Sequence, residues 1–423
     1  MTAPYHLCEL YVRESFSENF IPIAIPLIIL GLLYLLEGNH KKFLIFFVLG
    51  YTISIYSHLA MSIYFTLMIL VTFFIINIKK ICTKKNILYL VFAGILILLL
   101  TASFWMPLME IKLKGDYGVF IPYFMTGKGA LAGSTIPLWQ LVDFTKPYTH
   151  THLVYNLQLF VTIFVIGGVI LLIKDKKWKD TKWLSIFVFT VLSIIMVTPL
   201  FPWKYAPDIL QTLQFPWRLI LYIDFGAILI SGYFLQKFET KKFFKIAFIV
   251  IIGITLLSSF YYTRHSDKGE VDLSNVDYNL GMGNQNEYLP RKTLDSIEYF
   301  NNRSNEIITL EGSGKIEIIN NDVPTLTFKA SEVENLKIEL PRLYYMGYIL
   351  KKDGKEIELK QSDKGFLEAT ITEDGEYELE YEKTAIMHIG NVTSVLTTIA
   401  IIIYIIYKNK KKQKMIGNGE TKD

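Results

Sequence analysis

Charged residues are scarce in this sequence, and so are cysteines. Asp, Glu, Lys and Arg together make up 19% of the 423 residues, whereas hydrophobic residues make up 52%. A soluble domain carries about 25% charged residues, so this composition favours a membrane protein. Two cysteines, Cys8 and Cys82, are too few for a disulfide framework. Gly-x-Ser-x-Gly, His-Glu-x-x-His, Walker and Rossmann patterns are missing, which leaves soluble-enzyme templates without support.

The few charges are unevenly distributed. Residues 264–386 hold 25 of the 39 acidic residues and 15 of the 43 basic ones, a net charge of −10. The rest of the chain is therefore +14, since the whole chain is +4. This division predicts an acidic domain attached to a membrane body with basic loops, and the basic pI is no sign of a nucleic-acid partner.

Nine apolar runs approach the length that a helix needs to cross a hydrocarbon core about 30 Å thick. Basic clusters occupy alternate connections between these runs, as cytoplasmic loops do in membrane proteins. The alternation places 1–19, 106–156, 201–218 and 264–387 outside and the basic tail 408–423 inside. The expected spans are 20–37, 43–57, 59–78, 87–105, 157–173, 183–200, 219–236, 246–263 and 388–407.

Residues 43–78 form one uncharged run of 36 residues with lysines on both flanks. A single helix of that length would measure about 54 Å, too long for one crossing. The run must therefore enter the membrane and return, with a turn near Tyr56, Ser57 and His58. His58 is then an outer-side residue.

The first 19 residues do not form a signal peptide, because they carry Glu9, Arg13, Glu14 and Glu18 and no apolar region. Glu9 and Arg13 are four residues apart, so they would be neighbours on a helix and could pair. An outside N-terminus without a preceding span leads us to expect further sequence upstream of Met1.

Residues 264–386 change to a period-two pattern with short alternating segments. Asp353-Gly354 and Asp374-Gly375 lie between segments, and Asp-Gly is a favoured hairpin turn. Seven strands at this spacing predict a small antiparallel sandwich before the last helix. The expected strands are 315–319, 325–329, 337–340, 344–350, 355–359, 366–372 and 377–382.

Three outer-side residues are candidates for chemistry. Arg218 begins a span after Phe215-Pro216-Trp217, where its guanidinium either grips a phosphate or serves as an interfacial anchor. His58 is either a general acid or base, or a residue with a capping role. Glu110 either takes a proton from an acceptor hydroxyl or lies at a solvated helix end.

Other ionisable residues are less specific. Asp224 lies inside a span, where an acid is costly, and it is either functional or held in a structural hydrogen bond. It does not share a helix face with Arg218. His150 and His152 lie on one side of an extended segment, but the sequence supplies no further metal ligands, so no metal site is expected.

Six segments of the sequence are typical of one known family: PYHLCELYVRESFSEN, SHLA, SFWMPLMEIK, LQFPWRLI, NEYLP and LPRLYYMGYILKKDGKEIEL. They resemble segments of the YfhO-like bacterial membrane proteins, including relatives named after 6-pyruvoyl-tetrahydropterin synthase. Nothing in this sequence suggests pterin chemistry. The resemblance covers nearly the whole chain.

The resemblance implies a polytopic glycosyltransferase of the GT-C type in the bacterial plasma membrane, with no cofactor. Such enzymes move a sugar from a polyprenyl-phosphate donor to an envelope polymer such as teichoic acid on the outer face. Arg218 and Arg13 would hold the donor phosphate, and His58 and Glu110 would lie near the acceptor.

One departure from the family pattern concerns the catalytic acid. The family begins with further spans, and its acid lies in the first outer loop, whereas this chain resembles the C-terminal portion. The acid is therefore absent, replaced or supplied by a separate N-terminal polypeptide.

Two other functions stay open. A non-catalytic envelope scaffold or inactive fragment would use the β-domain to bind a polymer or partner. The second alternative function is transport of lipid-linked sugars. The scarcity of ionisable residues in the spans counts against a proton-coupled transporter.

Overall fold

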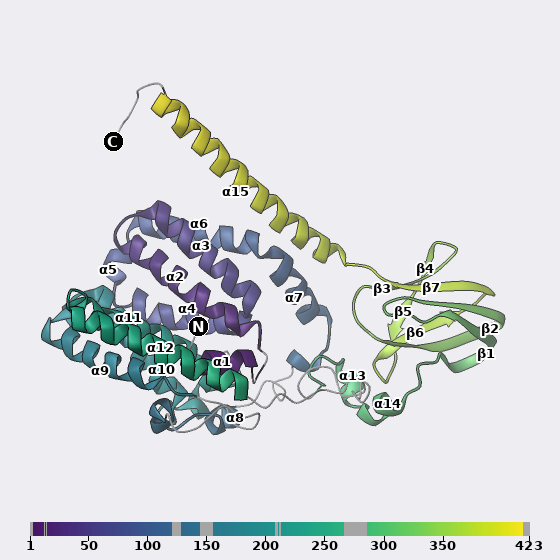
Figure 1. Ribbon diagram of the computed structural model, residues 1–423. Coiled ribbons are helices and arrows are strands. Elements are labelled where there is room, and N and C mark those ends of the chain that lie inside the picture. Colours follow the sequence, from purple (N-terminus) through teal and green to yellow (C-terminus); the bar gives the residue numbers. More distant parts are fainter. Residues whose placement is uncertain are drawn as a thin grey trace. The chain divides into compact units, whose positions relative to one another are not determined.

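The computed structural model describes residues 3–11, 13, 15–120, 128–143, 155–207, 210, 213–265 and 286–417. The chain divides into two compact units, each coherent in itself (Figure 1). The first unit combines Met1–Leu99 with Thr126–Val271, and the second combines Leu100–Met125 with Asp272–Asp423.

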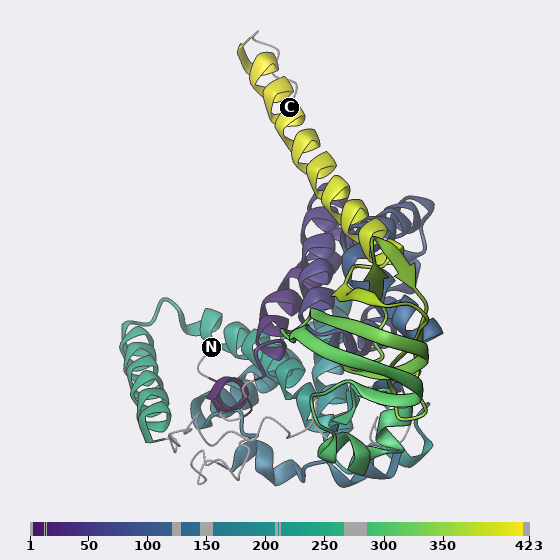
Figure 2. The ribbon, with the colours of Figure 1, turned by 90° about the vertical axis from the view of Figure 1, so that its right-hand side faces the viewer.

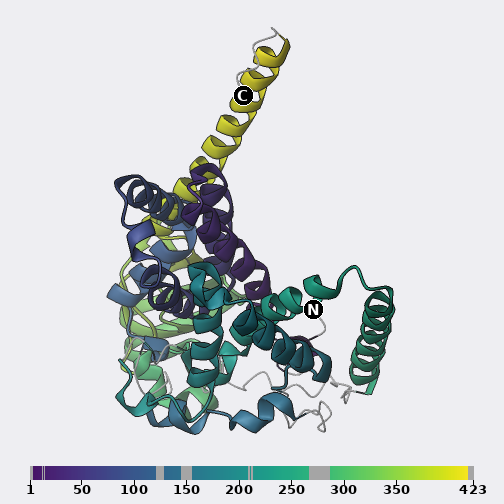
Figure 3. The same ribbon diagram turned by 90° about the vertical axis from the view of Figure 1, so that its left-hand side faces the viewer.

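The first unit is built of helices, which can be followed in Figures 1 and 3. Short 3-10 turns join several of them, among them Glu18–Phe20, Lys177–Lys179 and Pro216–Leu219. The helices are α1 (Pro4–Tyr11), α2 (Ile21–Leu36), α3 (His40–Ser57), α4 (Leu59–Ile69), α5 (Ile78–Ile81), α6 (Lys84–Leu100), α8 (Lys128–Gly133), α9 (Leu159–Lys174), α10 (Thr181–Val197), α11 (Ile220–Phe238) and α12 (Lys242–His265).

The pairing of α2 with α3 depends on two glycines. A Cβ atom on Gly31 would lie 2.8 Å from the Cβ of Phe47, and one on Gly50 would lie 2.7 Å from the side chain of Ile28. Small residues of this kind let two helix backbones approach closely, which is how helices associate where the surroundings are apolar.

The predicted reversal at His58 is confirmed as a break between α3 and α4. Hydrogen bonds join the side chains of Ser54 and Ser62 and those of Tyr51 and Thr66. In each pair the two residues are about equally far from His58 in the sequence, one before it and one after it. The chain therefore reverses its direction at His58.

The basic connections of the first unit meet at one end of its helices. Lys182 Nζ lies 2.6 Å from Glu37 at the end of α2, and Lys237 Nζ lies 2.8 Å from Asp175 after α9. Asn77 donates to Ser185, and His40 bonds Asn86, which brings the 77–86 connection to the same end. The grouping agrees with the alternation of basic loops in the sequence.

Three described helices are long and apolar enough to cross a membrane: Glu18–Leu36, Pro216–Phe238 and Ala385–Lys411. Residues 84–114 could supply a fourth span, but only as a pair of helices broken at Thr101. The expected nine spans are therefore not confirmed. The run 87–105, expected to be one span, is divided between α6 and α7 (Ala102–Lys114).

The second unit contains an antiparallel sheet of seven strands that curves in a barrel-like way (Figure 2). Its order is β4-β3-β7-β2-β6-β5, with β1 paired to β2. The strands are β1 (Ile308–Asn320), β2 (Leu326–Leu343), β3 (Tyr348–Lys352), β4 (Lys355–Ile357), β5 (Leu359–Gln361), β6 (Phe366–Ile371) and β7 (Gly375–Tyr381).

The predicted sandwich is not confirmed, because all the described strands belong to one sheet. The segments 325–329 and 337–340 are two parts of the single strand β2, whose ends pair with different neighbours. The segment 355–359 is instead divided between β4 and β5. Strand β2 supplies the centre of an apolar core that includes Phe328, Ile338 and Leu340.

Short helices and one long helix complete the second unit. They are α13 (Arg291–Leu294), α14 (Ile297–Asn302) and α15 (Ala385–Gly417), which is 33 residues long. The buried carboxylate of Glu339 on β2 accepts hydrogen bonds from Tyr299, Arg303 and Ser362 at 2.7 to 3.0 Å. These bonds fasten α14 and the residue that follows it to the sheet.

Candidate functional site

Glu18 lies at the centre of a buried cluster of charged side chains in the first unit. It precedes α2 and is completely buried. Its Oε1 atom is 3.0 Å from Nε of Arg218 and 3.6 Å from Nε2 of His58, and its Oε2 atom is 3.1 Å from Nη1 of Arg13. One carboxylate thus joins residues from three distant parts of the chain.

Arg13 follows α1 and is shared between two carboxylates. Its Nη1 atom lies 2.5 Å from both carboxylate oxygens of Glu9, which confirms the pair expected from the four-residue spacing. The guanidinium carbon lies 4.5 Å from the ring centre of Trp217. A guanidinium over an indole ring gains further electrostatic stabilisation, so Trp217 helps to hold Arg13 in place.

Arg218 is positioned by the 3-10 turn Pro216–Leu219 that leads into α11. Its Nη1 atom donates to the carbonyl oxygen of Leu213 at 2.9 Å and to Oε1 of Gln214 at 2.7 Å. Arg218 is 7% exposed. A buried cation is tolerated only when it is paired and hydrogen-bonded, and here Glu18 supplies the pairing charge.

His58 caps α4 and faces Glu18 with its other ring nitrogen. Its Nδ1 atom accepts a hydrogen bond from the backbone N–H of Met61 at 3.3 Å, so the ring proton belongs on Nε2. Burial, together with the charges of the two arginines, lowers the pKa of His58 to about 4, against the opposing effect of Glu18. His58 is therefore a neutral hydrogen-bond donor at neutral pH.

Glu9 is the acid of the cluster that can change its charge near neutral pH. Burial and the charge of Glu18 raise the pKa of Glu9 to about 7, against the opposing effect of Arg13. Burial, together with the negative charge of Glu9, also raises the pKa of Tyr5 well above its usual value. A carboxylate with a pKa near 7 is suited to accept or donate a proton.

Glu110 does not belong to the first unit. It lies on α7 in the second unit, where it accepts hydrogen bonds from Lys114 Nζ at 2.9 Å and from Thr384 Oγ1 at 2.5 Å. It is 5% exposed, so it is not at a solvated helix end. Thr384 also caps α15 by accepting from Met387 N–H, which gives Glu110 a place in the anchoring of that helix.

The remaining candidates add little to this site. Asp224 lies further along α11, and its Oδ2 atom is buried without a hydrogen-bond partner among the described residues. His150 and His152 lie outside the described residues. Within the described ranges, no group of three His, Cys, Asp or Glu side chains is arranged to hold a metal ion.

The structure thus brings together Arg13, His58 and Arg218, and adds Glu18 and Glu9, which the sequence did not single out as site residues. Glu18 comes directly before the first apolar run. An acidic residue at such a position, near an arginine, is the sequence signal that could have identified Glu18 as a site residue. Comparison of this chain with protein-family models, with curated proteins and with solved structures finds no match.

Proposed function

We propose that this chain is a glycosyltransferase-like membrane protein that transfers a sugar from a polyprenyl-phosphate donor to a cell-envelope polymer on the outer face of the bacterial plasma membrane. The observation that carries the proposal is the convergence of the partly buried Arg13 and the buried Arg218 on one carboxylate, beside an acid whose pKa is about 7. The fold supplies helices suited to a membrane around this cluster.

The two arginines bind the donor phosphate. A guanidinium presents paired N–H donors that match a phosphate, and it keeps its charge at every working pH. With both acids ionised, the charges of Arg13 and Arg218 are balanced by Glu9 and Glu18. The phosphate must therefore compete with these carboxylates for the arginines.

Glu9 takes the proton of the acceptor hydroxyl. The new bond forms between the acceptor oxygen and the anomeric carbon of the sugar, while the bond from that carbon to the phosphate oxygen breaks. The proton goes to Glu9, and the bonding electrons leave with the polyprenyl phosphate, which becomes a dianion. Negative charge thus moves from Glu9 to the leaving phosphate.

This charge shift is coupled to Arg13. Its Nη1 atom contacts both oxygens of the Glu9 carboxylate at 2.5 Å. Once Glu9 is neutral, Arg13 is held less strongly there and stabilises the new charge on the phosphate. Stabilisation of a charge that develops only during the reaction is the larger part of most enzymatic rate enhancements. His58 takes part as a neutral hydrogen-bond donor through its Nε2–H group. Glu110 lies in the second unit and has no role in this scheme.

Transfer of radiolabelled sugar from polyprenyl-phosphate donor to envelope polymer in isolated membranes tests the proposal. Arg218→Gln is expected to lower transfer by roughly a hundredfold, as the loss of one such donor does. Glu37→Gln, at the opposite end of the helices, is the control and should leave transfer unchanged. Protein levels and thermal stability are measured alongside, and full transfer by stable Arg218→Gln protein would refute the assignment.

A non-catalytic scaffold is favoured by one specific observation. Arg13 and Arg218 already have carboxylate partners, and Glu18 contacts three side chains, as in a purely structural network. In that case Arg218→Gln lowers stability only, and membranes that lack the protein transfer sugar as well as those that contain it.

A further inference from the structure

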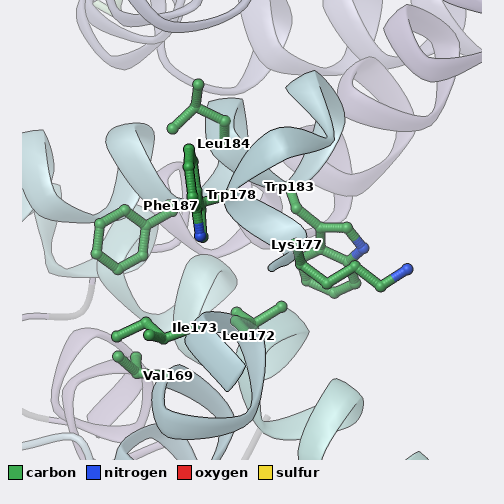
Figure 4. Close-up of a pocket in the computed structure, with 8 residues that line it drawn as sticks. All are labelled: Val169, Leu172, Ile173, Lys177, Trp178, Trp183, Leu184 and Phe187. Atoms are coloured by element: carbon green, nitrogen blue, oxygen red, sulfur yellow. The ribbon is translucent and has the colours of Figure 1, made fainter. Parts of the chain in front are cut away.

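A small cavity opens between α9 and α10 at the basic end of the first unit (Figure 4). It has a volume of about 50 Å³. Its walls come from the last turns of α9, the 3-10 turn Lys177–Lys179 and the first turns of α10. They include Val169, Ile173, Lys177, Trp178, Leu184 and Phe187.

The lining is apolar apart from the Lys177 amine and the indole N–H groups. In Figure 4 Trp178 and Phe187 lie on one side of the space, and Val169 and Ile173 lie on the opposite side. A water molecule needs two to four polar partners to stay in a cavity, so this site suits hydrocarbon better than water.

The helix surface beside the cavity is exposed and apolar. Ile166, Ile170 and Ile173 on α9 are 57%, 60% and 63% exposed. Phe187 on α10 is 39% exposed. An exposed apolar stripe of this kind on a helix marks a surface for membrane or protein contact. A chain lying along α9 would reach the cavity without crossing a polar barrier.

The opening lies beside a basic loop whose acids are already engaged. Asp175 accepts from Tyr233 at 2.6 Å and pairs with Lys237, while Asp180 accepts from the backbone N–H of Lys182. The loop therefore presents net positive charge through Lys174, Lys176, Lys177 and Lys179.

Trp178 lies within this basic loop and forms part of the cavity wall. It is 57% exposed, and Lys179 Nζ lies 5.4 Å from its ring centre. Tryptophan and lysine are the residues that gather at the headgroup level of a bilayer, where a ring stays partly wet and an amine reaches phosphate. The loop thus has the composition of a headgroup site directly above an apolar cavity.

We propose that this cavity and loop bind one anionic phospholipid. The part of an acyl chain nearest the headgroup occupies the space between Ile173 and Phe187, and the lipid phosphate pairs with Lys177 and Lys179. The small volume accommodates a few methylene groups, so the rest of the chain lies along the exposed face of α9. This site is separate from the charged cluster and does not rest on the glycosyltransferase proposal.

Native mass spectrometry of the full chain tests the site. The protein is released from nanodiscs that contain equal amounts of phosphatidylglycerol and phosphatidylcholine, and the retained lipid is identified by its mass. We expect one phosphatidylglycerol per chain, retained several-fold more often than phosphatidylcholine. Equal retention of the two lipids would overturn the anionic assignment.

Three variants separate the acyl-chain site from the headgroup site. Ile173→Trp fills the cavity and is expected to abolish the retained lipid, whereas Ile166→Trp, on the same helix and similarly exposed but outside the cavity, should retain it. Lys177→Gln combined with Lys179→Gln should keep a bound lipid but lose the preference for phosphatidylglycerol.

The outcomes that contradict the site are equally specific. Unchanged lipid retention in Ile173→Trp would overturn the cavity as the binding place. Loss of lipid in Ile166→Trp to the same extent would show a general effect of the helix surface and would also overturn it. A lipid-free dimer in the spectrum would assign the face to a second copy of the chain instead. None of these measurements uses a sugar donor, so they are independent of transfer activity.

Discussion

The Nε atom of Arg218 lies 3.0 Å from the Oε1 atom of Glu18, although the two residues are far apart in the sequence. The pair joins the start of α11 to the turn that precedes α2, and both side chains are buried. Because Glu18 also contacts Arg13 and His58, one carboxylate compensates the buried Arg218 and the partly buried Arg13. The stability of this end of the unit therefore depends on Glu18 more than on any other member of the cluster.

Glu18→Gln is expected to destabilise the protein by about 3–5 kcal/mol, because it leaves the buried guanidinium group of Arg218 without its carboxylate and Arg13 with less compensating charge. Thermal unfolding in detergent measures the effect. Glu37→Gln is the matched control, since Glu37 pairs with Lys182 at an exposed site where such bridges contribute about 0–1 kcal/mol. Equal unfolding midpoints for the two variants would contradict the central role of Glu18.

The low pKa of His58 predicts a loss of stability in acid. Its pKa is about 4 in the folded protein, against an ordinary value of 6.5. Between these values the unfolded chain binds a proton that the folded chain does not, so stability falls as pH falls from 6.5 to 4. The full effect is on the order of 3 kcal/mol.

His58→Asn isolates this contribution. Asparagine is a good N-cap and can still accept from the Met61 N–H, but it does not titrate. Unfolding midpoints measured from pH 4 to pH 7 should therefore depend less on pH in the variant. If both proteins lose stability equally toward pH 4, His58 is not the group responsible.

Glu9 has the opposite pH dependence. Its pKa is about 7 in the folded protein, against an ordinary value of 4.5, so the folded state holds a proton that the unfolded state releases. Stability from this group is complete below pH 4.5 and is lost as pH rises to 7. Glu9→Gln removes the loss, and its stability relative to the parent should increase between pH 5 and pH 8 by on the order of 3 kcal/mol. A constant difference between the two proteins over this range would contradict the raised pKa.

Part of the site could be predicted from the sequence. Basic loops at alternate connections placed Arg13, His58 and Arg218 at the same end of the helices, and the structure brings these three together. The central role of Glu18 was missed because a charge beside an apolar run suggests a helix end in water. The complete burial of Glu18 is favourable only because two arginines converge on its carboxylate. No local sequence pattern indicates this convergence.

The limits of the fold prediction also have physical causes. The break at Thr101 falls inside the expected span 87–105, and no charged residue or proline within that span marks it in the sequence. Strand β2 was read as two strands because the polar segment Ser331–Asn335 separates its apolar ends. Glu332 and Asn335 have positive φ angles of 57° and 45°, so the strand continues through local irregularities that resemble a turn in sequence.

The network around Glu339 is expected to stabilise the second unit. Glu339→Ala leaves Arg303, which is 3% exposed in its side chain, without its carboxylate, and should destabilise this unit by about 3–5 kcal/mol. Hydrogen exchange of the full chain measures the change in protection at α14 and the adjoining strands. Lys315→Gln removes an exposed pair with Glu332 and serves as the control, with protection expected to stay unchanged. Unaltered protection at α14 in Glu339→Ala would show that the helix is held by other contacts.

The close approach of α9 to α11 depends on Gly168. A Cβ atom there would lie 2.4 Å from the carbonyl oxygen of Ile230, which is backbone and cannot turn aside. Gly168→Ala must therefore push the helices apart, at an overpacking cost of about 1–3 kcal/mol. Gly232 on α11 has nothing within 4 Å of its Cβ position, so Gly232→Ala should be neutral or stabilise the helix by up to about 1 kcal/mol. The unfolding midpoint in detergent is expected to fall in Gly168→Ala and to stay unchanged or rise in Gly232→Ala. Equal gains in both variants would mean that α9 and α11 are not packed as closely as this contact requires.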